Sequence, residues 1–317
     1  MKPVAAGSFA HAVQEGLDRQ GQKELPSKYL YDEIGTALFD AITLLPEYGL
    51  TRADDRLLRQ HAADVVARLK APVIVAELGS GNGKKARSIL EALAHRHPTT
   101  YYPIEISRAA LLTCEHELDH LKRVSILGFE AEYLDGLRMA AARRRTDERL
   151  LVLFLGSSIG NFDTAPAERF LASIRSILSP DDAMLLSADL VKPTVRMVRA
   201  YDDPAGVTAA FNLNLLARIN RQLQADFHLR NFRHQAIYNS PQRRIEMHIV
   251  STARQAVMIR GARLALEFKR GETIWTESSY KYTSKGIVRM AARAGFKVES
   301  QWVDSEWPFA LSLLIPS

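Results

Sequence analysis

The sequence predicts an α/β protein in which a doubly wound, mostly parallel sheet is joined to a second, α+β domain. From Pro72 onward, short apolar runs alternate with helical periods. Near the end of the chain, two expected strands, Phe296–Val303 and Phe309–Ile315, are joined by a very short connection. Residues 191–280 do not follow this alternation, which indicates a second domain.

The parallel part of the sheet is predicted from apolar runs that are separated by amphipathic periods. Strands that alternate with helices form parallel βαβ units with right-handed crossovers, so we expect helices on both faces of the sheet. The expected strands are 73–78, 101–106, a weaker one at 124–133, 150–156 and 183–190, and the expected helices are 84–95, 109–122, 166–178 and 285–294.

The last two strands are linked so closely that they must pair antiparallel. A parallel sheet that is closed by an antiparallel C-terminal hairpin resembles the Rossmann-like fold of class I S-adenosylmethionine-dependent methyltransferases. Ordinary dinucleotide-binding dehydrogenases are parallel throughout.

The second domain is predicted from two separate segments. Residues before about Arg56 are typical of helices and turns, and Ala209–Leu223 is typical of a long helix that precedes several alternating strands. We therefore expect a methyltransferase domain formed by residues 56–190 and 281–317, and a substrate-binding domain formed by residues 1–55 and 191–280.

The composition is that of a globular protein, with 47% hydrophobic and 25% charged residues. No apolar run approaches the roughly 20 residues that cross a bilayer, and the N-terminal residues do not resemble a signal peptide. The single cysteine, Cys114, cannot form an internal disulfide and is typical of a reducing compartment. We expect a cytoplasmic monomer that binds no membrane.

Part of the net charge of +6 lies in the arginine-rich segment Arg138–Arg149. No aromatic residue alternates with these charges, so we interpret the segment as a solvated helix face and expect no nucleic-acid partner. An RNA-binding or RNA-modifying protein remains the alternative from a different functional class.

A glycine-rich turn follows the first predicted core strand, with Gly79, Gly81 and Gly83 at every second position. Glycines at such a turn let the backbone approach a ligand and adopt positive φ, although a plain tight turn would have the same pattern. Glu105 ends the next strand, where a carboxylate can accept both hydroxyls of a ribose. Glu132 and Tyr133 follow the third strand and could hold an adenine amine and ring.

The residues around the turn favour S-adenosylmethionine over a dinucleotide. Glu77 precedes the turn and suits a cationic amino-acid group better than a pyrophosphate. Lys85 could meet the carboxylate of the same group. We therefore expect S-adenosylmethionine as the methyl donor, bound by Gly79, Ser80, Gly81, Lys85, Glu105, Glu132 and Tyr133.

The segment His116–His120 matches the H-E-x-x-H zinc motif. On a helix, Leu111, Cys114 and Leu118 share one face, and both histidines fall on the opposite face. No third ligand is evident, so we expect exposed histidines and no metal.

Several further segments are too polar and too specific for simple packing, and they occur together in one family. The segments are "YDEIGTALFDAIT" with "LPEY", "ELGSG", "GSSIGN", "DLVK", "RAYDDPAGVTAAFN" and "RIEM", followed by Thr276, Glu277, Ser279 and Lys281. Over almost its whole length the chain resembles the bacterial L-histidine Nα-methyltransferases of ergothioneine biosynthesis. That family transfers three methyl groups from S-adenosylmethionine to the α-amine of histidine and yields hercynine.

The resemblance implies a role for each matching residue. Asn161 and Tyr201 would bind the histidine carboxylate, and Asn161 with Tyr31 would orient the amine. Tyr48 would close over the site. Glu277 and Ser279 would bind the imidazole nitrogens, Met247 would pack on that ring, and Gly156 would lie at the carboxyl edge of the sheet. The implied substrates are L-histidine and its mono- and dimethylated forms.

The spacing of Glu277 and Ser279 is independent support for a recognition pair. Residues i and i+2 of a strand point to one side, and a buried hydrogen-bonding pair rejects ligands that lack the partner atoms. Gly49 follows Tyr48 where the family usually has a second tyrosine, which would loosen the substrate lid. A methyltransferase acting on another amino acid, such as a tryptophan-like one, remains the alternative within the enzyme class.

Overall fold

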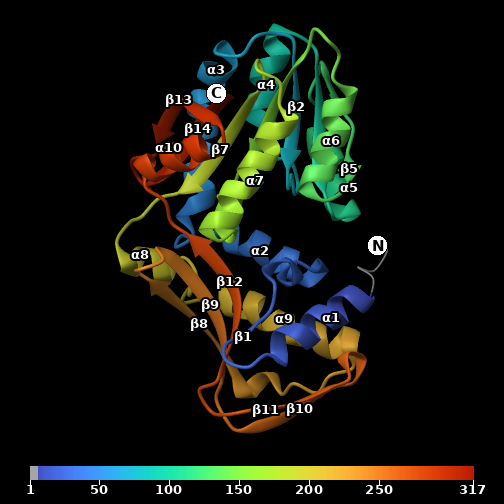
Figure 1. Cartoon of the computed structure of the whole chain (residues 1–317), viewed down its shortest axis with the longest axis vertical. Helices are drawn as coiled ribbons and strands as arrows, with labels where there is room; N and C mark the ends of the chain where they lie inside the picture. Colours follow the sequence, from blue (N-terminus) through green and yellow to red (C-terminus); the bar gives the residue numbers. More distant parts are fainter. Residues whose placement is uncertain (1–5) are drawn as a thin grey trace. The chain divides into compact units, whose positions relative to one another are not determined.

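The computed structural model describes residues 6–317, which form two compact units (Figure 1). The first unit comprises Leu50–Val191 and Lys281–Ser317, and the second comprises residues 6–49 and Lys192–Tyr280. The chain passes from one unit to the other at 49/50, 191/192 and 280/281, where the sequence analysis placed the boundaries at 55/56, 190/191 and 280/281.

The first unit is built on an eight-stranded sheet with the order β13-β14-β7-β6-β2-β3-β4, in which β5 also pairs with β3. Its strands are parallel except β14, which runs antiparallel to both β13 and β7. This is the doubly wound sheet with an antiparallel C-terminal hairpin that the sequence predicted. The strands are β2 (Val73–Leu78), β3 (Thr99–Glu105), β4 (Val124–Ile126), β5 (Phe129–Glu130), β6 (Arg149–Phe154), β7 (Ala183–Asp189), β13 (Phe296–Val303) and β14 (Phe309–Pro316).

Helices cover this sheet because each presents an apolar stripe to it. The helices are α3 (Gly49–Ala67), α4 (Arg87–Arg96), α5 (Arg108–Leu118), α6 (Tyr133–Arg143), α7 (Thr164–Ile177), α10 (Ser284–Arg293) and the 3-10 turn η2 (Ser158–Asn161). Leu137 of α6, Leu171 of α7 and Ile287 of α10 are fully buried in one hydrophobic cluster with the strands. These three helices pack on one face of the sheet (Figure 1).

The prediction of one strand over 124–133 was wrong. The structure has two short strands, β4 and β5, which pair with β3 separately, and Tyr133 begins helix α6. Gly128 separates the two strands at a point where a Cβ would lie 3.2 Å from the Leu111 side chain. The close approach of α5 to this bend therefore interrupts the strand.

The second unit contains the antiparallel sheet that the sequence predicted, with the order β1-β12-β9-β8. Strands β12, β9 and β8 pair antiparallel, and the two-residue β1 joins the edge of β12 in parallel. Helix α2 packs against α9 in this unit, and β10 and β11 form a separate hairpin. The elements are α1 (Ala6–Leu17), β1 (Lys23–Glu24), η1 (Ser27–Leu30), α2 (Glu33–Leu44), α8 (Thr194–Arg199), α9 (Val207–Leu223), η3 (Leu229–Asn231), β8 (Phe232–Asn239), β9 (Arg244–Ser251), β10 (Gln255–Ile259), η4 (Arg260–Ala262), β11 (Leu264–Phe268) and β12 (Thr273–Tyr280).

Candidate active site

The glycine turn leaves β2 in the left-handed conformation that its sequence predicted. Gly79, Gly81 and Gly83 have φ of +72°, +53° and +74°, values that side chains other than glycine rarely adopt. At Gly83 a Cβ would lie 2.5 Å from the Cys114 sulfur, whereas at Gly81 it would meet nothing within 4 Å. The turn is thus packed at its far end and open at Gly81.

Glu105 at the end of β3 is held against this turn by main-chain donors. The Gly81 N–H donates to Glu105 Oε2 over 3.3 Å, and the Ile106 and Ser107 N–H groups donate to Oε1 over 2.9 and 3.4 Å. Burial raises the pKa of Glu105, and these three hydrogen bonds oppose that rise. The carboxylate is therefore fixed beside the open part of the turn.

Glu132 and Tyr133 reach the same place from the first residues of α6. A Cβ on Gly79 would lie 3.1 Å from the Tyr133 hydroxyl, so the phenol ring rests on the bare backbone of the turn. Burial, with the nearby charges of Glu105 and Glu132, raises the pKa of Tyr133 to about 12. The phenol is therefore neutral at physiological pH, and the structure brings these predicted cofactor residues together.

The Ser80 side chain adds an unsatisfied group to the turn. Its Oγ is buried and has no hydrogen-bond partner among the described residues. A buried hydroxyl without a partner is costly unless a ligand or water completes it. This observation fits a polar ligand seated on the turn.

Lys85 and Gly156 were predicted for different ligands, yet the structure places them together. A Cβ on Gly156, whose φ is +73°, would lie 2.3 Å from Lys85 Nζ. The positive φ favours glycine at the end of β6, and a larger residue would push the Lys85 ammonium group aside. Asn161, the other predicted residue of this loop, ends the turn η2 and is exposed.

The sequence reasoning missed Asp54, which joins these two residues. Asp54 is fully buried on α3; its Oδ2 accepts a 2.8 Å hydrogen bond from the Gly156 N–H and lies 3.9 Å from Lys85 Nζ. Burial raises its pKa, and the Lys85 charge opposes the rise. The available signal was a carboxylate on the apolar stripe that Leu57 and Leu58 define.

Glu77, which was expected to suit a cationic group, is 2% exposed and accepts a hydrogen bond from the Tyr101 hydroxyl. Burial raises the pKa of Glu77 to about 8, although the Tyr101 bond and the Lys85 charge lower it. The Cys114 sulfur lies 4.0 Å from the same Tyr101 hydroxyl. Glu77 is thus engaged in the core of the first unit.

The other predicted residues lie in the second unit, where Glu277 and Ser279 are both buried on β12. Glu277 pairs with Met247 of the neighbouring β9, and Ser279 pairs with Ile245. Directly opposed residues of an antiparallel pair share a face. Glu277, Ser279 and Met247 therefore lie on one face of the sheet, as their spacing indicated.

Tyrosine side chains complete this face. Tyr201 Oη and Ser279 Oγ are 2.7 Å apart, and the Tyr31 hydroxyl donates to Glu277 Oε1 over 3.5 Å. The Tyr48 ring contacts the Tyr201 ring edge-on at 5.9 Å between centroids. The structure thus unites all six predicted substrate residues of this unit in one cluster.

The H-E-x-x-H match has the exposed histidines that were predicted. His116 and His120 are exposed, and α5 ends at Leu118, so the two histidines do not share a helix. Across residues 6–317, no group of three or more His, Cys, Asp or Glu side chains could hold a metal ion.

The expectation of one helix face over the arginine-rich segment was wrong beyond Arg143, because α6 ends there and Arg144, Arg145 and Arg149 follow it. Several arginines of the segment pair with acidic side chains. Arg138 pairs with Asp135, and Arg145 pairs with Asp147. Arg144 donates to Asp182. Among all the residues that the structure describes, 6–317, no helix is long and apolar enough to cross a membrane.

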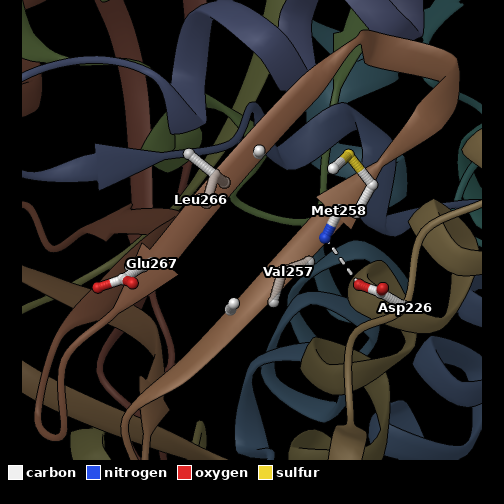
Figure 2. Close-up of a pocket in the computed structure, with 7 residues that line it drawn as sticks. Asp226, Val257, Met258, Leu266 and Glu267 are labelled. Atoms are coloured by element: carbon white, nitrogen blue, oxygen red, sulfur yellow. Dashed lines mark hydrogen bonds between the residues drawn. The ribbon is translucent and has the colours of Figure 1, made fainter.

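A hollow on the β10–β11 hairpin is lined by none of the predicted site residues (Figure 2). The Asp226 carboxylate lines this hollow and accepts a 2.7 Å hydrogen bond from the Met258 N–H. The remaining lining is formed by Ala256, Val257, Ala265, Leu266 and Glu267. This hollow has no cluster of convergent polar groups.

Comparison with known proteins shows the family of the chain. A family model described as a histidine-specific, S-adenosylmethionine-dependent methyltransferase matches residues 9–316. The histidine N-alpha-methyltransferases of Mycobacterium tuberculosis and Mycolicibacterium smegmatis are each 39% identical to this chain, over 95% and 98% of it and 92% and 97% of their own lengths. An L-tryptophan methyltransferase of Psilocybe serbica is 26% identical, over 97% of this chain and 93% of its own length. The chain belongs to the histidine-specific, S-adenosylmethionine-dependent methyltransferase family.

Proposed function

We propose that this enzyme transfers methyl groups from S-adenosylmethionine to the α-amine of L-histidine, three in succession, and yields hercynine for ergothioneine biosynthesis. The observation that carries the proposal is the arrangement of Glu277 and Ser279 on one strand face, with Tyr201 bonded to Ser279. The 39% identity to two histidine N-alpha-methyltransferases supports it.

The residues of the first unit fit the methyl donor. Glu105 would accept the ribose hydroxyls, and the Tyr133 ring with Glu132 would receive the adenine. Lys85 would pair with the donor's carboxylate, and the open backbone at Gly81 leaves room for close approach. When bound, S-adenosylmethionine supplies a methyl group whose carbon is made electrophilic by the sulfonium.

Imidazole recognition requires one acceptor and one donor, because the neutral ring has one N–H and one bare nitrogen. The Glu277 carboxylate would accept from the N–H, and the Ser279 hydroxyl would donate to the other nitrogen. The nearby Tyr201 hydroxyl would orient Ser279. An indole has a single N–H and offers no second nitrogen, so this pair favours histidine.

The amine must be neutral and held in line behind the sulfonium, which is a matter of position and desolvation. Its lone pair forms the new N–C bond while the C–S bond breaks and sulfur keeps the electron pair. The product ammonium loses a proton before the next transfer, and the quaternary third product has none to lose. Asn161, Tyr31 and Tyr201 would hold the amine and carboxylate through these steps, with Tyr48 closing over them.

We further infer that the enzyme acts in the cytoplasm as a monomer that needs no metal and no nucleic acid. The single cysteine, Cys114, is buried and free, which suits a reducing compartment. Light scattering on the purified protein measures its molar mass and so tests the inferred monomeric state.

The first experiment is mass spectrometry of the purified protein with S-adenosylmethionine and a mixture of the twenty amino acids. We expect histidine alone to gain three methyl groups, and the Glu277→Ala, Ser279→Ala double variant to lose this product. Ser278→Ala is the matched control, because Ser278 lies between them and faces the other way. Methylation of tryptophan instead would contradict the assigned substrate, and methylation of no amino acid would contradict the activity.

A further inference from the structure

His234 of β8 is buried in the second unit and contacts the main chain of a predicted substrate residue. Its Nε2 lies 2.7 Å from the carbonyl oxygen of Tyr201. A carbonyl oxygen only accepts hydrogen bonds, so Nε2 carries the proton and donates it. The remaining ring nitrogen, Nδ1, must then find a donor if the imidazole is neutral.

Asn212 of α9 supplies that donor. Its Nδ2 lies 2.9 Å from His234 Nδ1 and 3.2 Å from the carbonyl oxygen of His248. Thr276 Oγ1 donates to the amide oxygen of Asn212 over 2.7 Å. These contacts fix which end of the amide is nitrogen, and therefore fix the Nε2–H tautomer of His234.

The charges around His234 agree with a neutral ring. Burial lowers the pKa of His234 and outweighs the bond to the Tyr201 carbonyl and the attraction of Asp202 and Asp203. The neighbouring His248 lowers it further. With only one proton, His234 donates to Tyr201 and accepts from Asn212 at the same time.

The hydrogen-bond network of His234 and Asn212 also extends to the residue before Glu277, which is predicted to bind the imidazole. Thr276 sits where the register between β12 and β9 shifts, directly before Glu277. A bulge re-aims the side chains that follow it. The Thr276 hydroxyl holds it in place by sharing its one proton between the Asn212 amide oxygen and the Met247 carbonyl. Asn212 therefore links His234, which contacts the Tyr201 main chain, to Thr276, which precedes Glu277.

We propose that His234 is a positioning residue for histidine recognition, fixing the Tyr201 main chain so that the Tyr201 hydroxyl is held against Ser279. The proposal rests on the proposed function, because it assigns Tyr201 and Ser279 to the substrate. It names a side chain that does not touch the substrate and acts through a carbonyl group.

Two isosteric variants separate the halves of the network. In His234→Gln the amide nitrogen stands near the position of Nε2 and keeps the donor to Tyr201. In His234→Asn the amide oxygen stands near the position of Nδ1, keeps the acceptor for Asn212 and loses the reach to Tyr201. His228→Asn is the control, because His228 is exposed at the start of η3.

Steady-state kinetics of the purified enzyme measure KM for histidine in each variant. We expect His234→Asn to raise KM for histidine about tenfold, the equivalent of one lost hydrogen bond. His234→Gln should stay within about threefold of the parent. The KM for S-adenosylmethionine, and S-adenosylhomocysteine affinity by calorimetry, should not move in either variant. Equal effects of the two variants on KM for histidine, or a matching loss of S-adenosylhomocysteine affinity, would overturn the proposal.

Asn212→Asp tests the network if either histidine variant fails to fold. A carboxylate in place of the donating amide favours a doubly protonated imidazole. Nitrogen NMR of the ring should then report two N–H groups on His234, against one in the parent. A parent ring with Nδ1 protonated would contradict the proposal. If the parent enzyme methylates no histidine, the proposed function fails, whereas an active parent with equivalent Gln and Asn variants removes only this inference.

Discussion

Asp54 Oδ2 accepts a 2.8 Å hydrogen bond from the main-chain N–H of Gly156, although 102 positions separate the two residues. The bond ties helix α3 to the loop that follows β6. Lys85 Nζ lies 3.9 Å from the same oxygen. A buried carboxylate thus organises both the ammonium and the glycine that the sequence assigned to ligand binding.

Replacing Asp54 with asparagine should weaken binding of the methyl donor. The change removes the charge that holds the Lys85 ammonium beside Gly156, so we expect the Kd for S-adenosylhomocysteine to rise by about three- to tenfold. Calorimetry measures it. Asp55→Asn, one position along α3 and paired with Arg59, is the control. Tighter binding would show instead that Asp54 competes with the ligand for Lys85.

Gly156→Ala should impair ligand binding more than its backbone strain explains. Gly156 and Gly206 have similar φ, +73° and +75°, but only at Gly156 would the new Cβ meet Lys85 Nζ, at 2.3 Å. Both alanine variants should lose about 1 to 2 kcal/mol of unfolding free energy. Only Gly156→Ala should raise the Kd for S-adenosylhomocysteine. Equal Kd values in the two variants would show that Lys85 does not act through this contact.

Tyr201→Phe removes the hydroxyl that lies 2.7 Å from Ser279 Oγ. We expect KM for histidine to rise about tenfold, because Ser279 loses its orienting partner. The KM for S-adenosylmethionine should stay constant. Tyr238→Phe on β8 is a control for removal of a tyrosine hydroxyl elsewhere in this unit. An unchanged KM for histidine would remove Tyr201 from the substrate site.

Stability should fall as the pH rises through the range in which Glu77 ionises in the folded protein. Burial raises the pKa of Glu77 from 4.5 to about 8, so between these values the folded state binds more protons than the unfolded state. The stability that the protonated Glu77 carboxyl contributes is fully present below the unfolded pKa, and it is lost as the pH rises through about 8. Urea unfolding from pH 5 to 8 should show a steeper decline for the parent than for Glu77→Gln. Parallel curves would mean that Glu77 is ionised throughout.

The two histidines of the H-E-x-x-H match should be dispensable. Both side chains are exposed, so the His116→Ala, His120→Ala double variant should keep its unfolding free energy within about 0.5 kcal/mol per site. Methylation rates with and without EDTA should agree for parent and variant. Loss of activity in EDTA, restored by zinc, would contradict the expectation of a metal-free reaction.

The strands and the glycine turn were predictable because their signals are local. The strand bounds Val73–Leu78 and Phe296–Val303 agree with the structure. The first is a buried run that ends at the glycine turn, and the second is one arm of a closely linked hairpin. Glu277 and Ser279 were found from the period of a strand and from the family resemblance.

The residues that the sequence did not reveal act through contacts that only the tertiary structure creates. His234 reaches a carbonyl group, which carries no side-chain signature, and Asp54 meets a backbone N–H on a distant loop. The break in the strand at 124–133 depends on the approach of α5 to Gly128. Such features follow from packing and not from local propensity.

The position of β14 between β13 and β7 has a consequence for synthesis on the ribosome. Strand β7 is made well before β14, and the Lys192–Tyr280 segment of the second unit is translated in the interval. Until Phe309–Pro316 emerges, the fully buried residues of β7 form an unpaired apolar edge, the kind of surface that chains aggregate through. A nascent chain stalled before residue 309 should therefore depend on chaperones, and the large sheet can close only after Phe309–Pro316 has been made.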